Sequence, residues 1–427
     1  MKNLLLHTVK TTLFLLCLVS FLPWTAYAAQ PLSLPELLQI AKAQNPQLEQ
    51  IRQLHLAAQA AIPQATASSN PQIGLIQNPI PGSPFRLGAS EGFSYTLTQP
   101  FQLFGKKALA GAIAKDQADT VGTQVTFTEQ QLQSQVKGIF YQLLASLRQE
   151  TVSQDNIQRL EQIKRITKIR YANNAAAYGD YLNAQVAQSS AQNDLFALQR
   201  QTDTLRQTLN TLIGRDPQQP LAVSGEIPGI QRDATTLDQL ILLTLKNNPA
   251  LKGSGYQMAA AEKGVTYARK AYLPDFQVIV TKISDHPPWG LSGNTFGMEL
   301  DIVLPTWFLE KEKAGEDQAR ANLMAVQSSD QAMRQQVLLN VASAYNTWLQ
   351  AVKQVQFLSD RQLPEANAAW RLMSQNYATN NGTAFSDLLL AQSNLKNTEL
   401  ALLQAESAAA QSWSSLEAAV GAPLTHE

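Results

Sequence analysis

The sequence predicts a mostly α-helical, elongated protein with a small membrane-embedded β part, built from two copies of one structural unit. Three features of the 427-residue chain support this fold class. The stretch from Phe101 to Asp216 contains no proline, the order of prolines and glycines in the first half recurs in the second, and short alternating segments precede each long helical run. Together they indicate long antiparallel helical hairpins attached to strands.

The proline-free stretch predicts one very long helix and its antiparallel return. Apolar residues recur there at steps of three and four, which places a narrow stripe on one helix face. The stripe consists of Leu132, Val136, Phe140, Leu143, Leu147, Ile157, Leu160, Ile163, Ile166 and Ile169. A helix from Lys106 to Tyr171 would extend roughly 99 Å at about 1.5 Å per residue, too long for a compact domain. Asn173, Asn174 and Gly179 interrupt the stripe, so we expect the hairpin tip near Tyr178 to Tyr181.

The chain matches itself in two halves. The pair Asn45-Pro46 recurs as Asn248-Pro249, a displacement of 203 residues. The same displacement relates Leu34 to Leu237, Leu37 to Leu240, Leu48 to Leu251 and Pro71 to Pro274. A displacement of 207 relates Asp180 to Asp387, Leu182 to Leu389, Ala184 to Ala391, Gln185 to Gln392, Leu209 to Leu416 and Gly214 to Gly421. Chance matching between two leucine- and alanine-rich stretches is the alternative, which the kept order of prolines and glycines disfavours.

The first 29 residues read as a secretory signal peptide. Two lysines precede an apolar stretch, and Ala26-Tyr27-Ala28 supplies the small residues that cleavage requires. Leu15 and Leu16 stand where a lipoprotein signal needs small residues, so Cys17 is not expected to carry lipid. Because Cys17 is the only cysteine, the mature chain can form neither a disulfide nor a thiolate metal site. Removal of the two lysines leaves 31 of the 33 basic residues against 33 acidic ones, which argues against a nucleic-acid partner.

The repeat sets the expected domain boundaries. They are a signal peptide over 1–29, a first repeat over 30–216 with a strand pair at about 71–100, a proline- and glycine-rich linker over 217–234, and a second repeat over 235–427 with a strand pair at about 274–304. Each repeat opens on short helices that break at the Asn-Pro pair. They run from Leu34 to Gln44 and from Pro46 to Thr66, with a counterpart of the latter from Pro249 to Tyr272.

The second hairpin carries a proline that the first lacks. It is expected to run out from Lys311 to about Tyr377 and to return from Asp387 to Val420. Pro364 lies inside the outgoing helix. Because proline removes a backbone donor and clashes with the preceding turn, we expect a bend or a break there.

The strand segments alternate in polarity. From Gly92 to Gln99, apolar residues alternate with serine and threonine, and the second half repeats the pattern in two strands. The apolar positions are Phe93, Tyr95 and Leu97, then Phe276, Val278 and Val280, then Phe296, Met298, Leu300 and Ile302. A period of two with aromatic residues on one face fits strands with lipid outside and water inside. An ordinary half-buried sheet of a soluble protein is the alternative.

Four strands cannot close a membrane barrel, because the smallest barrels have about eight. Since an open sheet edge is not tolerated in lipid, the strands must be completed by other copies of the chain. The loops Asn78 to Ser90 and Ser284 to Asn294 are rich in proline, glycine and serine, which suits an exposed outer surface. An aromatic belt is expected at the opposite end of the strands, from Phe101, Phe104, Trp307 and Phe308.

These features resemble the TolC-type outer-membrane efflux proteins over the whole mature chain. One specific pattern is the strand-to-helix passage QPFQLFGKK at 99–107, with LPTW at 304–307 in the second half. The other is the tip pattern Tyr377, Gly382, Ser386, Asp387, Leu389 and Ala391. The resemblance implies a homotrimer whose three chains share a twelve-stranded barrel in outer-membrane lipid, continued by a periplasmic tunnel of helices. It also implies two partners, a periplasmic adaptor and an inner-membrane pump, expected to be proton-driven.

No catalytic, cofactor or metal site is expected. The mature histidines His55, His286 and His426 lie on three separate elements, a poor basis for a metal site or a triad. We expect them to be surface residues.

The resemblance directs attention to the tip, where helices of three chains would converge. A ring of carboxylates there would attract cations, with Asp387 as first candidate and its repeat partner Asp180 as second. Helix N-capping is the competing role for both. In many family members a second acid follows in this motif, and here Leu390 occupies its position, with Asn183 in the first half. A double acidic ring is therefore not expected.

Further candidate residues follow from the same resemblance. Small and polar tip residues would let an adaptor hairpin approach closely, namely Gly179, Asp180, Gly382, Thr383, Ser386 and Asp387. Glu299 and Asp301, on the polar face of their strand, would make the barrel lumen mildly acidic. A solvated acidic pair is the alternative for these two.

The expected function is that of the outer-membrane duct of a tripartite efflux system, extending into the periplasm and passing heavy-metal cations or drugs. The exit duct of a type I protein-secretion system is the alternative within the same fold. A soluble periplasmic coiled-coil scaffold is the alternative from another class. The sequence has no nucleotide-binding loop, so the energy would come from the pump.

Overall fold

The structure is a computed structural model that describes residues 31–77, 93–229, 236–284, 295–304, 310–379 and 381–424. The first repeat comprises α2 (Leu34–Gln44), α3 (Pro46–Thr66), β1 (Gln72–Gln77), β2 (Phe93–Phe101), α4 (Lys106–Ala172) and α5 (Tyr178–Leu212). The second comprises α6 (Leu237–Asn247), α7 (Pro249–Lys270), β3 (Asp275–Ser284), β4 (Thr295–Val303), α8 (Lys311–Phe357), the π-helix η3 (Leu358–Gln362), α9 (Leu363–Ala378) and α10 (Phe385–Val420). The signal peptide, both strand-connecting loops, Trp307, Phe308, His286 and His426 lie outside the described residues.

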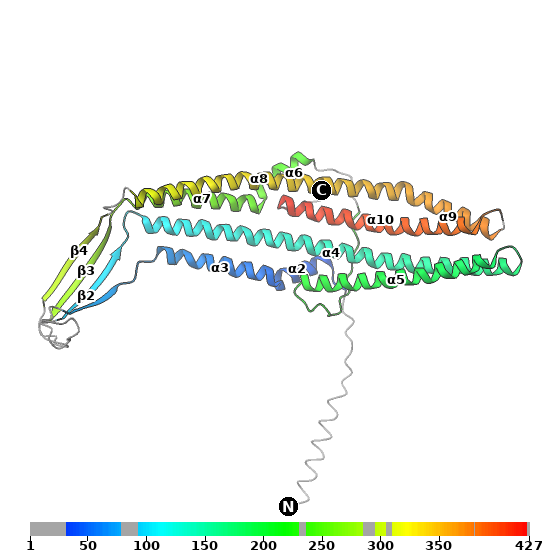
Figure 1. Ribbon diagram of the computed structural model, residues 1–427, viewed down its shortest axis with the longest axis horizontal. Helices are drawn as coiled ribbons and strands as arrows, with labels where there is room; N and C mark the ends of the chain where they lie inside the picture. The colour runs from blue at the N-terminus through cyan, green and yellow to red at the C-terminus, as the bar shows by residue number, and fades with distance from the viewer. Residues whose placement is uncertain are drawn as a thin grey trace, which may run out of the picture.

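The long helices lie side by side in one layer, with the sheet at one end and the hairpin tips at the other (Figure 1). Nearer the sheet, α4 packs between α3 and α7, and α7 packs on α8. Nearer the tips, α4 packs between α5 and α10, and α10 packs on α8 and α9. The helix α4 has 67 residues and would be about 100 Å long at 1.5 Å per residue. The prediction of long antiparallel hairpins in a twofold repeat is confirmed.

An asparagine joins the stacked short and long helices in each repeat. Asn45 Oδ1 accepts a hydrogen bond from Leu48 N at 3.0 Å and so caps α3, while its Nδ2 donates to Leu212 O at 2.8 Å at the end of α5. Asn248 repeats the arrangement, since it caps α7 and donates to Ala419 O at 2.9 Å near the end of α10. One side chain therefore begins one helix and binds the end of the next, which gives the repeated Asn-Pro pair its structural role.

The repeated glycines stand at the same joints. Gly214 and Gly421 have φ angles of +75° and +81°, a conformation that other residues rarely adopt. A Cβ on Gly421 would lie 2.7 Å from Asn248 Cα, and one on Gly214 would lie 2.3 Å from Gln44 O. Each glycine thus ends its helix and lets the backbone of the facing helix approach.

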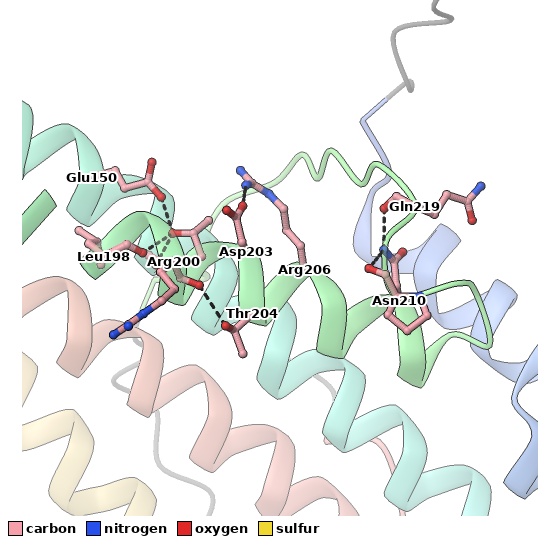
Figure 2. A network of polar contacts seen from close by, with 11 residues as sticks. Glu150, Leu198, Arg200, Asp203, Thr204, Arg206, Asn210 and Gln219 are labelled. Carbon is pink, nitrogen blue, oxygen red and sulfur yellow. Dashed lines mark hydrogen bonds and ion pairs between the residues drawn. The ribbon is translucent and has the colours of Figure 1, made fainter. Parts of the chain in front are cut away.

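The linker packs against the first repeat near the end of α5. Leu32 N donates to Ala222 O at 2.9 Å, and Ser224 N donates to Leu32 O at 3.0 Å. Figure 2 shows the amide of Asn210, in α5, bound to Gln219 O, at a distance of 2.8 Å. The start of the described chain and the end of α5 therefore hold the linker from two sides.

The four strands form one antiparallel sheet in the order β1-β2-β3-β4. The register aligns the alternating residues across all four strands. Ile73 faces Leu97, which faces Val280, which faces Met298. On the other face, Gly74, Thr96, Thr281 and Gly297 form the corresponding row. Apolar residues thus gather on one face, and small or polar residues predominate on the other, as the alternation predicts, with Ile76 and Ile279 among the exceptions.

The apolar face of the sheet is exposed. Ile73 and Met298 are 85% and 81% exposed, and further exposed residues on this face are Leu75, Leu97, Val280, Phe296, Leu300 and Ile302. Burial of such side chains normally provides much of a sheet's stability. Lipid or another molecule that covered this face would therefore add to the stability of the sheet. The alternative of an ordinary half-buried sheet does not agree with this exposure.

The core follows the predicted stripe. Val136, Phe140 and Leu143 are buried against Leu37 of α2 and Ile213 after α5. The stripe residues Leu132, Val136, Phe140, Leu143 and Leu147 of α4 recur in α8 at a displacement of 205 residues, as Val337, Val341, Tyr345, Trp348 and Val352. At the tips the displacement is 207, so the second hairpin gains two residues between Val352 and the tip.

The proline in the second hairpin has a local effect. The π-helix η3 lies in the stretch that gains the two residues, and Pro364 follows it at the start of α9. A π-turn absorbs an inserted residue without breaking the helix, and proline is tolerated in a first turn. The predicted bend or break is thus a π-segment, and α8, η3 and α9 remain one rod (Figure 1).

One predicted position is wrong. The tip of the first hairpin was expected near Tyr178 to Tyr181, but those residues form the first turn of α5, and the turn covers residues 173–177. The reason is Asn174, whose left-handed φ of +56° closes the turn before Gly179 is reached. No helix in the described ranges has the length and apolar content that a membrane span requires.

Candidate functional site at the helical tips

Two turns make the tip of the molecule. Between α4 and α5, Ala175 N donates to Arg170 O at 2.8 Å. Between α9 and α10, Asn381 N donates to Asn376 O at 2.9 Å, and Gly382 has a φ of +73°. Both turns end in an alanine that precedes the returning helix. The two tips therefore share one design, as their repeat relation predicts.

A single arginine links the two tips. The guanidinium carbon of Arg170, in the last turn of α4, lies 4.3 Å from the ring centroid of Tyr377, in the last turn of α9. The same guanidinium donates to Tyr377 O and, at 3.1 Å, to Ala175 O. Tyr377 OH in turn lies 3.3 Å from Thr167 Oγ1 of α4. Arg170 and Tyr377 thus hold the first hairpin to the second through a cation–π contact and hydrogen bonds.

This link sits on a small apolar core. Tyr377 is buried with Leu160, Ile163, Phe385 and Leu388, and its ring centroid lies 6.0 Å from that of Phe385. The cluster joins residues of α4, α9 and α10. Sequence reasoning placed Tyr377 in a tip pattern but missed Arg170. The repeat could have pointed to Arg170, because it lies 207 residues before Tyr377, the displacement that relates the two tips.

A groove of about 890 Å³ lies between the two tips. Of the predicted adaptor-docking residues, Asp180, Thr383 and Ser386 line it, together with Arg170 and Asn183. Gly179, Gly382 and Asp387 lie outside the lining, and a Cβ on either glycine would meet nothing within 4 Å. The structure therefore brings three of the candidate residues to one groove and leaves the two glycines on open surface.

The two candidate gate carboxylates are not helix caps. Ala177 and Ala384 precede α5 and α10, and neither helix start has a side-chain cap hydrogen bond. Asp180 and Asp387 instead lie third in their helices, in the first turn. A carboxylate there interacts favourably with the helix dipole. Asp387 is exposed and Asp180 is half-buried, so both carboxylates can meet ions.

Polar contacts continue up the seam between the two hairpins. Arg159 forms a forked ion pair with Glu399 at 2.6 and 3.2 Å, and Lys137 pairs with Glu417 at 2.5 Å. Between them, the amide of Gln142 donates to Gln411 at 2.6 Å. Within the first hairpin, hydrogen bonds from Lys164 and Gln188 hold the pKa of Glu161 below its ordinary value. The hairpins thus meet through side chains that bind in a fixed geometry but that water can replace.

At the other end of the molecule, Glu299 and Asp301 lie on the face of β4 opposite its exposed apolar row. Their strand partners are Ile279 and Gln277 of β3. The position agrees with the predicted polar face, though Ile279 makes this face less polar there than expected. No group of three or more metal-binding side chains occurs among the described residues.

The model of the outer membrane efflux protein family matches residues 37–215 and 240–422, and thus matches each repeat separately. The chain belongs to this family. An outer membrane efflux protein is a channel and not an enzyme, and it lies in the outer membrane and extends into the periplasm. Membership in this family excludes the alternative of a soluble periplasmic coiled-coil scaffold.

Solved structures show the same fold. The outer-membrane channel OprN is 17% identical, with 91% of this chain and 90% of that chain covered and a TM-score of 0.79. CusC is 16% identical, with 91% and 92% covered and a TM-score of 0.79. VceC from Vibrio cholerae is 16% identical, with 91% and 96% covered and a TM-score of 0.76. No curated protein sequence matches this outer membrane efflux protein.

Proposed function

We propose that this outer membrane efflux protein is the trimeric duct of a tripartite efflux system, in which three chains share a twelve-stranded barrel. The observation that carries the proposal is the sheet, which has one exposed apolar face and two unpaired edge strands, β1 and β4. Lipid would cover the face. Sister chains would pair the edges, since backbone groups of an open edge remain unsatisfied in lipid.

The helical layer supports the same assembly. It continues the sheet with α3 and α5 along one border and α8 and α9 along the other. Three layers joined at these borders would enclose a tunnel about as long as α4, roughly 100 Å. Exposed apolar residues on the border helices are available for such contacts, for example Leu54, Phe196 and Leu372.

The tip groove is the proposed docking site for a periplasmic adaptor. Thr383, Ser386 and Asp180 line it, and the open surface at Gly179 and Gly382 lets another helical hairpin approach closely. The adaptor would connect the duct to an inner-membrane pump, which we propose to be proton-driven. Small metal cations or drugs are the proposed cargo.

The Arg170–Tyr377 link is the proposed latch of the gate. While it holds, the two hairpins of a chain stay together, and Asp387 and Asp180 of three chains would form acidic rings that favour cations. Glu299 and Asp301 would add a second acidic zone in the barrel. Opening would exchange the polar seam contacts for water and would also uncover the small apolar core around Tyr377.

Deletion and fractionation test the proposal. The wild-type chain should be recovered from the outer membrane as trimers, and its deletion should increase sensitivity to metal salts or drugs. A monomer released by osmotic shock would contradict it. If deletion instead abolished secretion of a protein and left sensitivity unchanged, the chain would be the exit duct of a type I secretion system.

A further inference from the structure

The joint between α7 and α10 leaves an open groove in the helical layer. Figure 1 shows the two helices end to end between α4 and α8. At this joint a groove of about 510 Å³ is lined from all four helices. Its floor is built of small or apolar residues, namely Pro249, Ala250, Gly253, Val337, Ala418 and Ala419. The groove exists because two helix ends meet there in place of one continuous helix.

The lining contains no charged side chain. Phe127 of α4 and Met333 of α8 lie on the rim, 42% and 38% exposed. Neutral hydrogen-bonding side chains complete it, namely Thr120, Thr123, Gln124, Gln131, Asn248, Ser254, Gln257, Gln336 and Asn340. Nearby charged residues lie outside the lining and bind one another, as Lys263 binds Asp116 and Arg334 binds Asp330, whose carboxylate also accepts a hydrogen bond from Ser254 at 2.7 Å. The uncharged lining is therefore a local property of the groove.

A second uncharged hollow extends it towards the sheet. This hollow, of about 490 Å³, lies over α4, α7 and α8 and shares Thr120 and Gln257 with the first. Its other lining residues are Ile113, Gln117, Ala260, Ala261, Gly264, Ala319, Asn322 and Val326. The two form one elongated surface along the helix axes, with apolar and amide side chains and no charge.

The groove and the linker contact opposite sides of α4. Gly225 of the linker lies against Phe140 of α4, since a Cβ there would be 3.1 Å from the Phe140 ring. Gln131 lines the groove from the same helix. The step of nine residues from Gln131 to Phe140 corresponds to about two and a half turns, which places the two side chains on opposite sides of α4. No described residue of the linker lines the groove, so the linker leaves it uncovered.

We propose that this groove is a binding subsite for uncharged, amphipathic organic molecules of drug size. That such molecules reach it during passage through the duct rests on the proposed function, whereas the binding does not. Pockets for such molecules have volumes of about 300 to 1,000 Å³, an apolar floor and a few polar groups that fix orientation. The groove has this volume and an apolar floor, and its polar groups are nine neutral side chains.

The same lining disfavours the binding of metal cations, the other proposed cargo. A metal cation requires carboxylate, imidazole or thiolate ligands, and none lines the groove. An organic ion would lose hydration without gaining a counter-charge, whereas a neutral molecule loses little. Amide side chains on the exposed rim can form single hydrogen bonds with many different neutral molecules, which suits transient binding during passage.

Binding to the whole trimer in lipid nanodiscs tests the proposal. The probe is phenylnaphthylamine, an uncharged molecule that fluoresces in apolar sites, with empty nanodiscs subtracted. We expect saturable binding that the neutral drug chloramphenicol displaces and that Cu²⁺ does not. Met333→Gln should weaken binding about fivefold, because it removes an apolar contact at the rim. The matched control is Met324→Gln, the same change on an exposed methionine of α8 outside the groove.

A charge inserted at the rim provides a second test. Gln336→Lys should weaken phenylnaphthylamine binding at least as much as Met333→Gln, whereas Gln335→Lys, beside it but outside the lining, should not. Equal binding by all four variants, or binding that does not saturate, would overturn the subsite. Stronger displacement by Cu²⁺ than by chloramphenicol would also overturn it. None of these outcomes affects recovery of outer-membrane trimers, on which the proposed function depends.

Discussion

The Arg170–Tyr377 link gives the sharpest prediction about the gate. Arg170→Ala removes two contacts between the hairpins, the cation–π contact at 4.3 Å and the hydrogen bond to Tyr377 O, together with a bond to Ala175 O within the first hairpin. A cation–π contact contributes about 1 kcal/mol and a net hydrogen bond a similar amount. Because Arg170 is only half-buried, we expect the substitution to weaken the contact between the two hairpins by roughly 2 kcal/mol for each chain. This loss shifts the equilibrium about thirtyfold towards separated hairpins.

Planar bilayer recording measures this shift. Arg170→Ala trimers should show higher conductance or a larger open fraction than wild type, and cells that carry them should admit large antibiotics. Lys168→Ala is the matched control, since this exposed lysine of α4 faces away from the link. Wild-type conductance in an Arg170→Ala trimer that assembles normally would refute the latch. Arg170→Lys should fall between the two, because an ammonium keeps the charge but not the forked geometry.

Four further predictions concern the tip, the joint and the layer. Asp387→Asn should reduce the cation preference of the channel in bilayers, and unchanged selectivity would exclude an acidic ring. Gly179→Trp should abolish efflux while trimers still assemble, and loss of trimers would instead assign the glycine a role in folding. Asn248→Ala should lower stability by about 1 to 2 kcal/mol, measured by denaturant unfolding against Asn247→Ala, because it removes a cap and the bond to α10. The Ser254 hydroxyl, and after it Arg334, lower the pKa of Asp330 in the folded state. The ionised carboxylate therefore adds to the free energy of unfolding above the ordinary aspartate pKa, and this contribution is lost as the pH falls through the folded-state pKa. In melting experiments, acid should destabilise the wild type more than Asp330→Asn.

Much of the fold could be predicted from the sequence because its signals are local or periodic. Proline and asparagine fix helix starts, so the bounds of α3 at Pro46 and Thr66 agree with the prediction. The period of two fixed which strand residues share a face, and the register of β2, β3 and β4 aligns them. The repeat then extended each local prediction to the second half.

What could not be predicted depends on contacts between distant parts of the chain. The Arg170–Tyr377 link joins residues 207 positions apart, and neither side chain is unusual in its own segment. The first tip turn was misplaced because glycine is the usual left-handed residue, whereas Asn174 took that conformation. The groove at the joint follows from two helix ends meeting beside α4 and α8, which no periodic pattern records.

Disulfide trapping between the edge strands tests most directly whether sister chains complete the sheet. Within one chain β1 and β4 are separated by two strands, so about 14 Å lies between them, beyond the roughly 7 Å that a disulfide spans. The mature chain would have no other cysteine if cleavage follows the predicted site. Leu75→Cys is combined in turn with a cysteine at each position of β4 and expressed in cells.

Some of these pairs should yield covalent trimers in the outer-membrane fraction on non-reducing gels, and each single cysteine should not. Monomers with an internal disulfide between β1 and β4 would mean that a lone chain closes its own sheet. That result would contradict the central claim that three chains share the barrel.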